Sequence, residues 1–211
     1  MVDIKQLLSR SSELEKILLP LLKAGLYDNT DRLSVSRTVC GISLEYANST
    51  RVLIEVGNFT SAIGLMRLQY EAIVRAVWLL YAASDIAVSK LAVQLTDESE
   101  QKAANMPMLS EMLIQINKKA PKQASQMLHA IKDVSGKAMN SFVHCGIHAV
   151  NRHDSGFPLH LIVQIMQTSN ALSTMCGMVL GILSGDDNAS NRIRKIQLEF
   201  KDCLPPLKNI S

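Results

Sequence analysis

The sequence predicts an all-α protein, a bundle of about seven helices that forms one domain over residues 1–211. Hydrophobic residues make up 47% of the chain and charged residues 19%, which is typical of a globular protein with a substantial core. Ten glycines and six prolines leave few breaks for a fold of strands and turns. The chain also lacks any alternating strand pattern and any internal repeat. Its length fits one compact domain.

The first half of the chain contains three long helical patterns and a short one. Apolar residues recur every three or four positions in the first pattern, and Pro20 is expected to kink or divide that helix. Asp31 is the expected N-cap of the second helix, and Ser84 with Asp85 caps the short one. The expected ranges are Ile4 to Leu22, about Asp31 to Gly57, Asn58 or Thr60 to Ala83, and a short helix from Asp85.

The second half contains the remaining helices and the best candidate for a loop. That loop is the polar stretch "TDESEQKAAN", residues 96–105. Pro121 and Pro158 each occupy the first turn of an expected helix, where proline is favoured. The expected ranges are Met106 to Lys118, Pro121 to Asp133, Ser135 to His153, a long apolar helix from Pro158, and a basic amphipathic helix from Arg192 to Leu204.

The N-terminus and the cysteines predict a cytoplasmic protein. The first sixteen residues carry charges throughout and contain no secretory cleavage pattern. The four cysteines lie far apart in the sequence, which favours neither a disulfide framework nor a thiolate zinc site.

The longest apolar segment, Pro158 to Gly185, is interrupted by His160, Gln164 and Asn170. These polar residues favour a buried bundle helix over a membrane span. No membrane association is therefore expected.

Two polar ridges are the main candidates for a site. In the third helix, Arg67, Glu71 and Arg75 are spaced four apart, so they form one charged ridge on an otherwise apolar helix. The ridge is either an exposed ladder of ion pairs or an anion-binding or catalytic ridge on an inner face. Because the helix is apolar on nearly every side, the inner position is favoured.

The second ridge lies in "MNSFVHCGIHAVNRH", residues 139–153. On one helix, Asn140, His144, His148 and Arg152 would be successive neighbours four residues apart. Two histidines on one face can bind zinc, but the glutamate of the His-Glu-x-x-His motif is absent here. The sequence therefore predicts neither a metal site nor a cofactor. If the two ridged helices are neighbours, mutual burial would satisfy both ridges.

The segments "RLQYEAIVRAVWLLYAA" (residues 67–83) and "MNSFVHCGIHAVNRH" resemble all-helical bacterial proteins related to the HEPN superfamily. The resemblance extends from about Asp31 to Leu183. It implies a helical bundle, a homodimer, and a metal-independent ribonuclease or toxin of a toxin–antitoxin or phage-defence system. RNA and an antitoxin or another defence-system protein are the partners that it implies.

The HEPN signature is an arginine, a polar residue that is commonly asparagine, three further residues and a histidine. Asn140 and His144 match this spacing, whereas Met139 occupies the arginine position. Either Arg67 or Arg75 then supplies the missing cation, or the chemistry is lost and the fold serves binding.

The resemblance also implies a mechanism, in which His144 takes the proton from an RNA 2′-hydroxyl while an arginine holds the phosphate and Asn140 orients either group. The reaction would leave a cyclic phosphate. Glu71, between the two arginines, is expected to belong to the catalytic residues. Ser141, His148 and Arg152 are expected to bind the substrate.

Two non-catalytic interpretations remain open. The ridges can form a polar network that fixes helix register or a dimer interface, and the ten methionines suit such adaptable packing. The arginine ridge can instead receive the phosphate of a small ligand. The net charge of +3 and only nine aromatic residues count against an extensive RNA-binding surface.

Overall fold

The computed structural model describes residues 3–206 and folds them into ten α-helices, with no strand in that range. The all-α prediction is confirmed, and the expected number of seven helices was wrong. In chain order the helices are α1 (Ile4–Leu22), α2 (Asp31–Glu55), α3 (Phe59–Tyr81), α4 (Asp85–Ala92), α5 (Asp97–Ala103), α6 (Leu109–Lys119), α7 (Lys122–Val143), α8 (Ile147–Ser155), α9 (Leu159–Leu183) and α10 (Ala189–Glu199).

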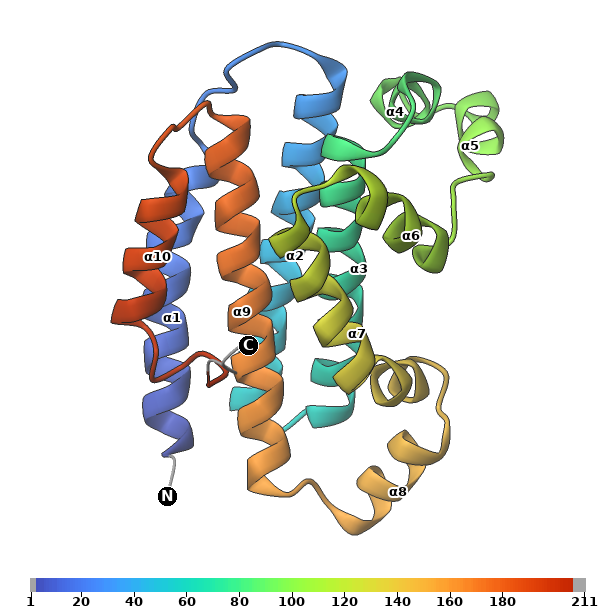
Figure 1. Cartoon of the computed structure of the whole chain (residues 1–211). Helices are drawn as coiled ribbons and strands as arrows, with labels where there is room; N and C mark the ends of the chain where they lie inside the picture. The colour runs from blue at the N-terminus through green and yellow to red at the C-terminus, as the bar shows by residue number, and fades with distance from the viewer. Residues whose placement is uncertain (1–2, 207–211) are drawn as a thin grey trace.

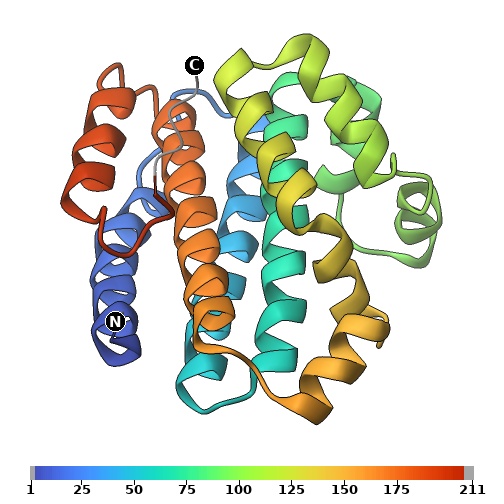
Figure 2. The same cartoon turned by 60° about the horizontal axis from the view of Figure 1, so that its bottom comes forward.

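Four long helices, α1, α2, α3 and α9, run side by side and form the body of the molecule (Figures 1 and 2). The other helices cover this body. Helix α10 packs on α9, α6 and α7 pack on α3, and α8 lies beyond the end of α7 (Figure 1). None of the helices in residues 3–206 is long and apolar enough to cross a membrane.

Helix α9 is the central element of the body, and sixteen of its 25 residues are buried. It begins after Pro158, as the sequence predicts. Its contacts with α1 and α10 depend on Gly177 and Gly181. A Cβ atom at Gly177 would lie 2.7 Å from a methyl group of Leu18, and one at Gly181 would lie 2.6 Å from the Cβ of Ala189. Glycine at these positions therefore allows the neighbouring helices to approach closely.

A buried polar network joins α3 to α9. The Gln69 side chain is fully buried, and its Nε2 donates to the Ser169 carbonyl at 2.9 Å and to the Ser173 hydroxyl at 3.3 Å. The Ser169 hydroxyl donates back to Gln69 Oε1 at 2.7 Å. From α2, the Ser43 hydroxyl donates to the Gln69 carbonyl at 3.4 Å. Both the Nε2 and the Oε1 atoms of the Gln69 amide therefore have hydrogen-bond partners on α9. Because these partners exist in one alignment of the helices, the buried amide also fixes the register of α3 against α9.

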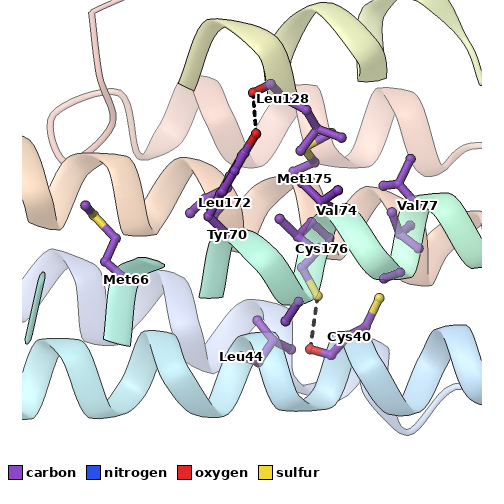
Figure 3. Packing of buried hydrophobic residues seen from close by; sticks show 14 of the residues in the cluster. Cys40, Leu44, Met66, Tyr70, Val74, Val77, Leu128, Leu172, Met175 and Cys176 are labelled. Atoms are coloured by element: carbon purple, nitrogen blue, oxygen red, sulfur yellow. Dashed lines mark hydrogen bonds between the residues drawn. The ribbon is translucent and has the colours of Figure 1, made fainter. Parts of the chain in front are cut away.

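A close view of the core shows how α7 and α2 are attached to this pair of helices (Figure 3). The Tyr70 hydroxyl on α3 donates to the Leu128 carbonyl on α7 at 3.0 Å. On the α2 side, the Cys176 thiol donates to the Cys40 carbonyl at 3.4 Å. The hydrogen bond to Cys40 and complete burial raise the pKa of the Cys176 thiol. All four cysteines are free, and Cys145 alone of them is exposed.

Several expected boundaries were wrong. Residues 96–105 are not a loop, because α5 begins within them on a capping box between Thr96 and Ser99. The expected break between Asp133 and Ser135 is also absent. Leu128 and Met139 lie three turns apart on the same face of α7 and are both buried, so packing keeps the helix continuous through Gly136. Pro20 does not divide α1, since the helix ends two residues later.

We predict that Ser169→Ala lowers the free energy of unfolding by about 1–3 kcal/mol, because it leaves the buried Oε1 of Gln69 without its donor. The double variant Gln69→Leu/Ser169→Ala should cost less than the sum of the two single changes, since no unpaired partner remains. Urea unfolding of the four proteins measures this coupling. Ser9→Ala, at an exposed position of α1, is the matched control and should change little. Additive single effects would contradict the network.

Candidate functional site

The charged ridge of α3 passes from the interior to the surface. Arg67 and Glu71 form an ion pair at 2.9 Å, with 13% of the Arg67 side chain and 41% of the Glu71 side chain exposed. Arg75 is exposed and forms no ion pair with any residue in the range 3–206. The ridge was expected to be either exposed or on an inner face. Each expectation holds for one end of it, because Arg67 is largely buried and Arg75 lies in solvent.

Arg67 lies beside the contact between α3 and α7. Its guanidinium carbon is 5.8 Å from the centre of the Tyr70 ring, and its buried Nε has no hydrogen-bond partner among the described residues. Burial raises the pKa of the Tyr70 hydroxyl, and the nearby Arg67 charge only partly opposes that shift. Tyr70 therefore remains a neutral donor to Leu128. Arg67 thus has a packing role in addition to its charge.

The expected helix from Ser135 to His153 is broken in its middle, so the predicted continuous ridge from Asn140 to Arg152 was wrong. Helix α7 ends at Val143, and α8 begins at Ile147. Between them Cys145 adopts a left-handed conformation with φ 49°, and the Gly146 N–H donates to the Ser141 carbonyl at 2.7 Å. This pattern is a Schellman motif with cysteine at the position that glycine usually occupies. We call residues 140–157, which include the last turn of α7, this break and α8, the elbow.

Ser141 and Gly146 determine the shape of the elbow. The Ser141 hydroxyl accepts a hydrogen bond from the His148 N–H at 3.0 Å and so caps the N-terminus of α8. A Cβ atom at Gly146 would lie 2.6 Å from this hydroxyl oxygen, which explains why glycine occupies the position. Ser141, expected to bind substrate, therefore has a structural contact of its own.

The elbow is anchored to the start of α3 by aromatic residues. The Phe157 ring lies 5.3 Å from that of Phe59 and 6.1 Å from that of Phe142, measured between ring centres. Thr60 Oγ1 lies 3.5 Å from His153 Nδ1. These contacts hold α8 against the bundle and determine which of its side chains reach solvent.

The elbow presents several of the predicted side chains to solvent. Asn140, His144 and His148 are exposed, whereas Arg152 is partly buried. Met139, at the position of the signature arginine, is only 1% exposed, so this position faces the core. An arginine there would place a charge in the apolar interior.

The cation nearest to these residues along α7 was not among the predicted site residues. Lys137 is exposed and lies three residues before Asn140 and seven before His144, so the three share one face of the helix. The spacing was visible in the sequence. However, the expected ridge began at Asn140 and continued into residues that prove to belong to a different helix.

The two ridges lie on neighbouring helices but do not form one closed site. Helix α7 packs along α3, as expected. Among residues 3–206, no hydrogen bond or ion pair links Arg67, Glu71 or Arg75 to the predicted residues of α7 and α8. The described residues also include no group of three histidine, cysteine or carboxylate side chains that could hold a metal ion.

A small cavity lies between α1, α2 and α9. Its lining includes Ser11, Asn170 and an ion pair between Glu15 and Arg51 at 3.2 Å. The cavity measures about 20 Å³, which is enough for one water molecule. A phosphate-bearing metabolite would not fit there.

We predict that Cys145→Gly raises the free energy of unfolding by about 0.5–1 kcal/mol. Glycine adopts the left-handed conformation without the steric cost that a Cβ atom imposes, and its greater freedom in the unfolded state offsets only part of this gain. Cys145→Ser retains the Cβ atom and is the matched control, expected to unfold like the wild type. Thermal and urea unfolding compare the three proteins. Equal stability of the glycine variant and the control would contradict the strained turn.

Comparison with known proteins gives one family match. A model described as "Family of unknown function (DUF6988)" matches residues 40–206, well over half of the chain. The match begins inside α2 and includes α3, the elbow and α9. No curated protein and no solved structure matches the chain. The chain belongs to the DUF6988 family of unknown function.

Proposed function

We propose that this chain is a HEPN-like RNA-binding protein and that the surface formed by Lys137, Asn140, His144, His148 and Arg152, the elbow face, contacts RNA phosphates. The observation that carries this proposal is that Lys137 and His144 share one face of α7, that His148 and Arg152 follow on α8, and that none of the four forms an ion pair with another residue in the range 3–206. Unpaired basic side chains can neutralise phosphates without first breaking internal contacts.

The charges of this part of the chain favour an anionic partner. Residues 132–154 contain two lysines, one arginine and three histidines against two aspartates, Asp133 and Asp154. With the histidines neutral, the excess is one positive charge, so the segment suits a short contact with RNA backbone and not an extensive RNA-binding surface. A single stretch of RNA backbone is the size of partner that such a surface fits.

His144 is the proposed proton-transfer group. Its exposed side chain has no hydrogen bond to any described residue, so it can turn toward a bound 2′-hydroxyl. Lys137 is the cation that shares its helix face, and Arg152 is the cation on α8. Arg67 is the weaker candidate, because its guanidinium already pairs with Glu71 and packs beside Tyr70. The reaction needs no metal ion, since a histidine and a cation supply both the proton transfer and the charge.

The second candidate function is a non-catalytic interaction module of a toxin–antitoxin or defence system. It is favoured by apolar side chains at the elbow, where Ile147 is 74% exposed and Val150 60% exposed. Exposed aliphatic groups contribute little to phosphate binding but much to a protein interface. A partner such as an antitoxin would cover them.

We expect the wild-type protein to bind and cleave mixed RNA in the presence of EDTA and to leave a cyclic phosphate end. His144→Ala should abolish cleavage and retain binding, because the imidazole is exposed and its loss leaves the fold intact. Lys137→Ala should weaken binding and reduce the slope of log affinity against log salt by about one. Lys195→Ala, on α10, is the control for loss of one exposed lysine. Absence of both cleavage and RNA binding in the wild type would favour the interaction module.

We predict that Arg67→Ala lowers the free energy of unfolding by about 1–2 kcal/mol, because the side chain is largely buried and packs beside Tyr70. Arg75→Ala should change it by less than about 0.5 kcal/mol, since that side chain is exposed. Urea unfolding measures both. If Arg67 instead holds the phosphate, its alanine variant will lose RNA binding at temperatures where it remains folded.

A further inference from the structure

The two short helices α4 and α5 lie outside the four-helix body (Figure 1). We call this segment, residues 84–104, the arm. Helix α4 packs on α2, and α5 packs on α4. Val88 is the one buried residue of α4, and α5 has no buried residue. A segment that buries so little within its own chain has side chains free to contact another molecule.

Three aliphatic side chains of the arm face solvent. Ile86 is 73% exposed, Val93 56% and Leu95 82%. Ile86 and Val93 are two helical turns apart, on the face of α4 opposite the buried Val88. Leu95 follows in the link between α4 and α5. Exposed aliphatic groups that lie close together in this way are unfavourable in water and are typical of a protein interface.

Polar contacts hold the arm in place. Arg32 of α2 donates to the Asp85 carboxylate at the start of α4 at 2.7 Å. In the link, the Ser99 hydroxyl donates to the Gln94 carbonyl at 2.9 Å and accepts the Thr96 N–H at 2.8 Å. The aliphatic side chains are therefore presented in a fixed arrangement, and a partner binds them without the entropic cost of ordering the arm first.

The arm is acidic, in contrast to the chain as a whole. It contains four carboxylates and two lysines, whereas the net charge of the chain is +3. Lys102 is paired with Glu98 at 2.6 Å, and neither Asp97 nor Glu100 forms an ion pair with another residue in the range 3–206. Acidic residues in the first turn stabilise α5 through the helix dipole, but the dipole does not explain the exposed aliphatic residues beside them.

We propose that the arm is the docking site for a basic amphipathic helix of another protein. Ile86 and Val93 are about 10.5 Å apart along α4, which matches the two-turn spacing of an apolar stripe on a facing helix. That stripe covers the aliphatic side chains, including Leu95, and the lysines or arginines of the partner pair with Asp97 and Glu100. RNA is repelled by these carboxylates, and a second copy that presented the same arm would bring like charges together.

Two synthetic amphipathic helices of about four turns test the docking site, with leucines at the same positions and either lysines or glutamates at the others. The wild-type protein should bind the leucine–lysine peptide at least about tenfold more tightly than the leucine–glutamate peptide, measured by fluorescence anisotropy. Ile86→Ser and Leu95→Ser should each weaken binding of the lysine peptide about tenfold, because each removes a large aliphatic group from the contact. The double variant Asp97→Asn/Glu100→Gln should bind more weakly and with less dependence on salt.

Matched controls separate the arm from the rest of the surface. Leu198→Ser on α10 removes an exposed leucine and Glu45→Gln on α2 removes an exposed carboxylate, and both should bind the lysine peptide within about twofold of the wild type. Circular dichroism checks that every variant is folded. The proposal is overturned by no binding of the lysine peptide up to about 100 µM, by equal binding of the two peptides, or by folded arm variants that bind like the controls.

Discussion

The burial of α9 against α3 is the constraint on which the rest of the structure depends. Helix α9 is too apolar to face solvent, and the fully buried Gln69 amide on α3 must find partners wherever α9 passes. The backbone carbonyl of Ser169 and the hydroxyls of Ser169 and Ser173 supply those partners in one register only. Sliding α9 by one residue would leave a buried amide unpaired, at a cost of about 1–3 kcal/mol, so the polar network selects the register that the apolar packing allows.

The surface helices follow from this central pair. Tyr70 is on α3 one residue after Gln69, and its hydroxyl holds α7 through the Leu128 carbonyl. The direction of α7 then determines where its last turn ends, and the Ser141 cap with Gly146 turns the chain into α8. His144 is the C-cap of α7, directly before the turn, and its side chain is exposed to solvent there. The positions of the elbow side chains thus depend on packing that begins in the core.

The sequence predicts the body of the fold well and the site only in part, for physical reasons that differ between residues. Pro158 marked the start of α9 correctly, because proline at a first helical turn is a local signal. The elbow was missed because its left-handed residue is Cys145, whereas sequence rules expect glycine or asparagine there. The presence of Lys137 on the same face as His144 became evident only when the break at the elbow showed which residues belong to one helix.

The position of the elbow at one end of α7 limits which cations can take part in the function that we propose. Helix α7 has 22 residues and is therefore about 33 Å long, with the elbow at its C-terminal end. Met139, at the position of the signature arginine, faces the core, and Arg67 on α3 is already paired with Glu71. A phosphate bound at the elbow face would therefore depend on Lys137 from α7 and Arg152 from α8, because neither of them forms an ion pair with another residue in the range 3–206.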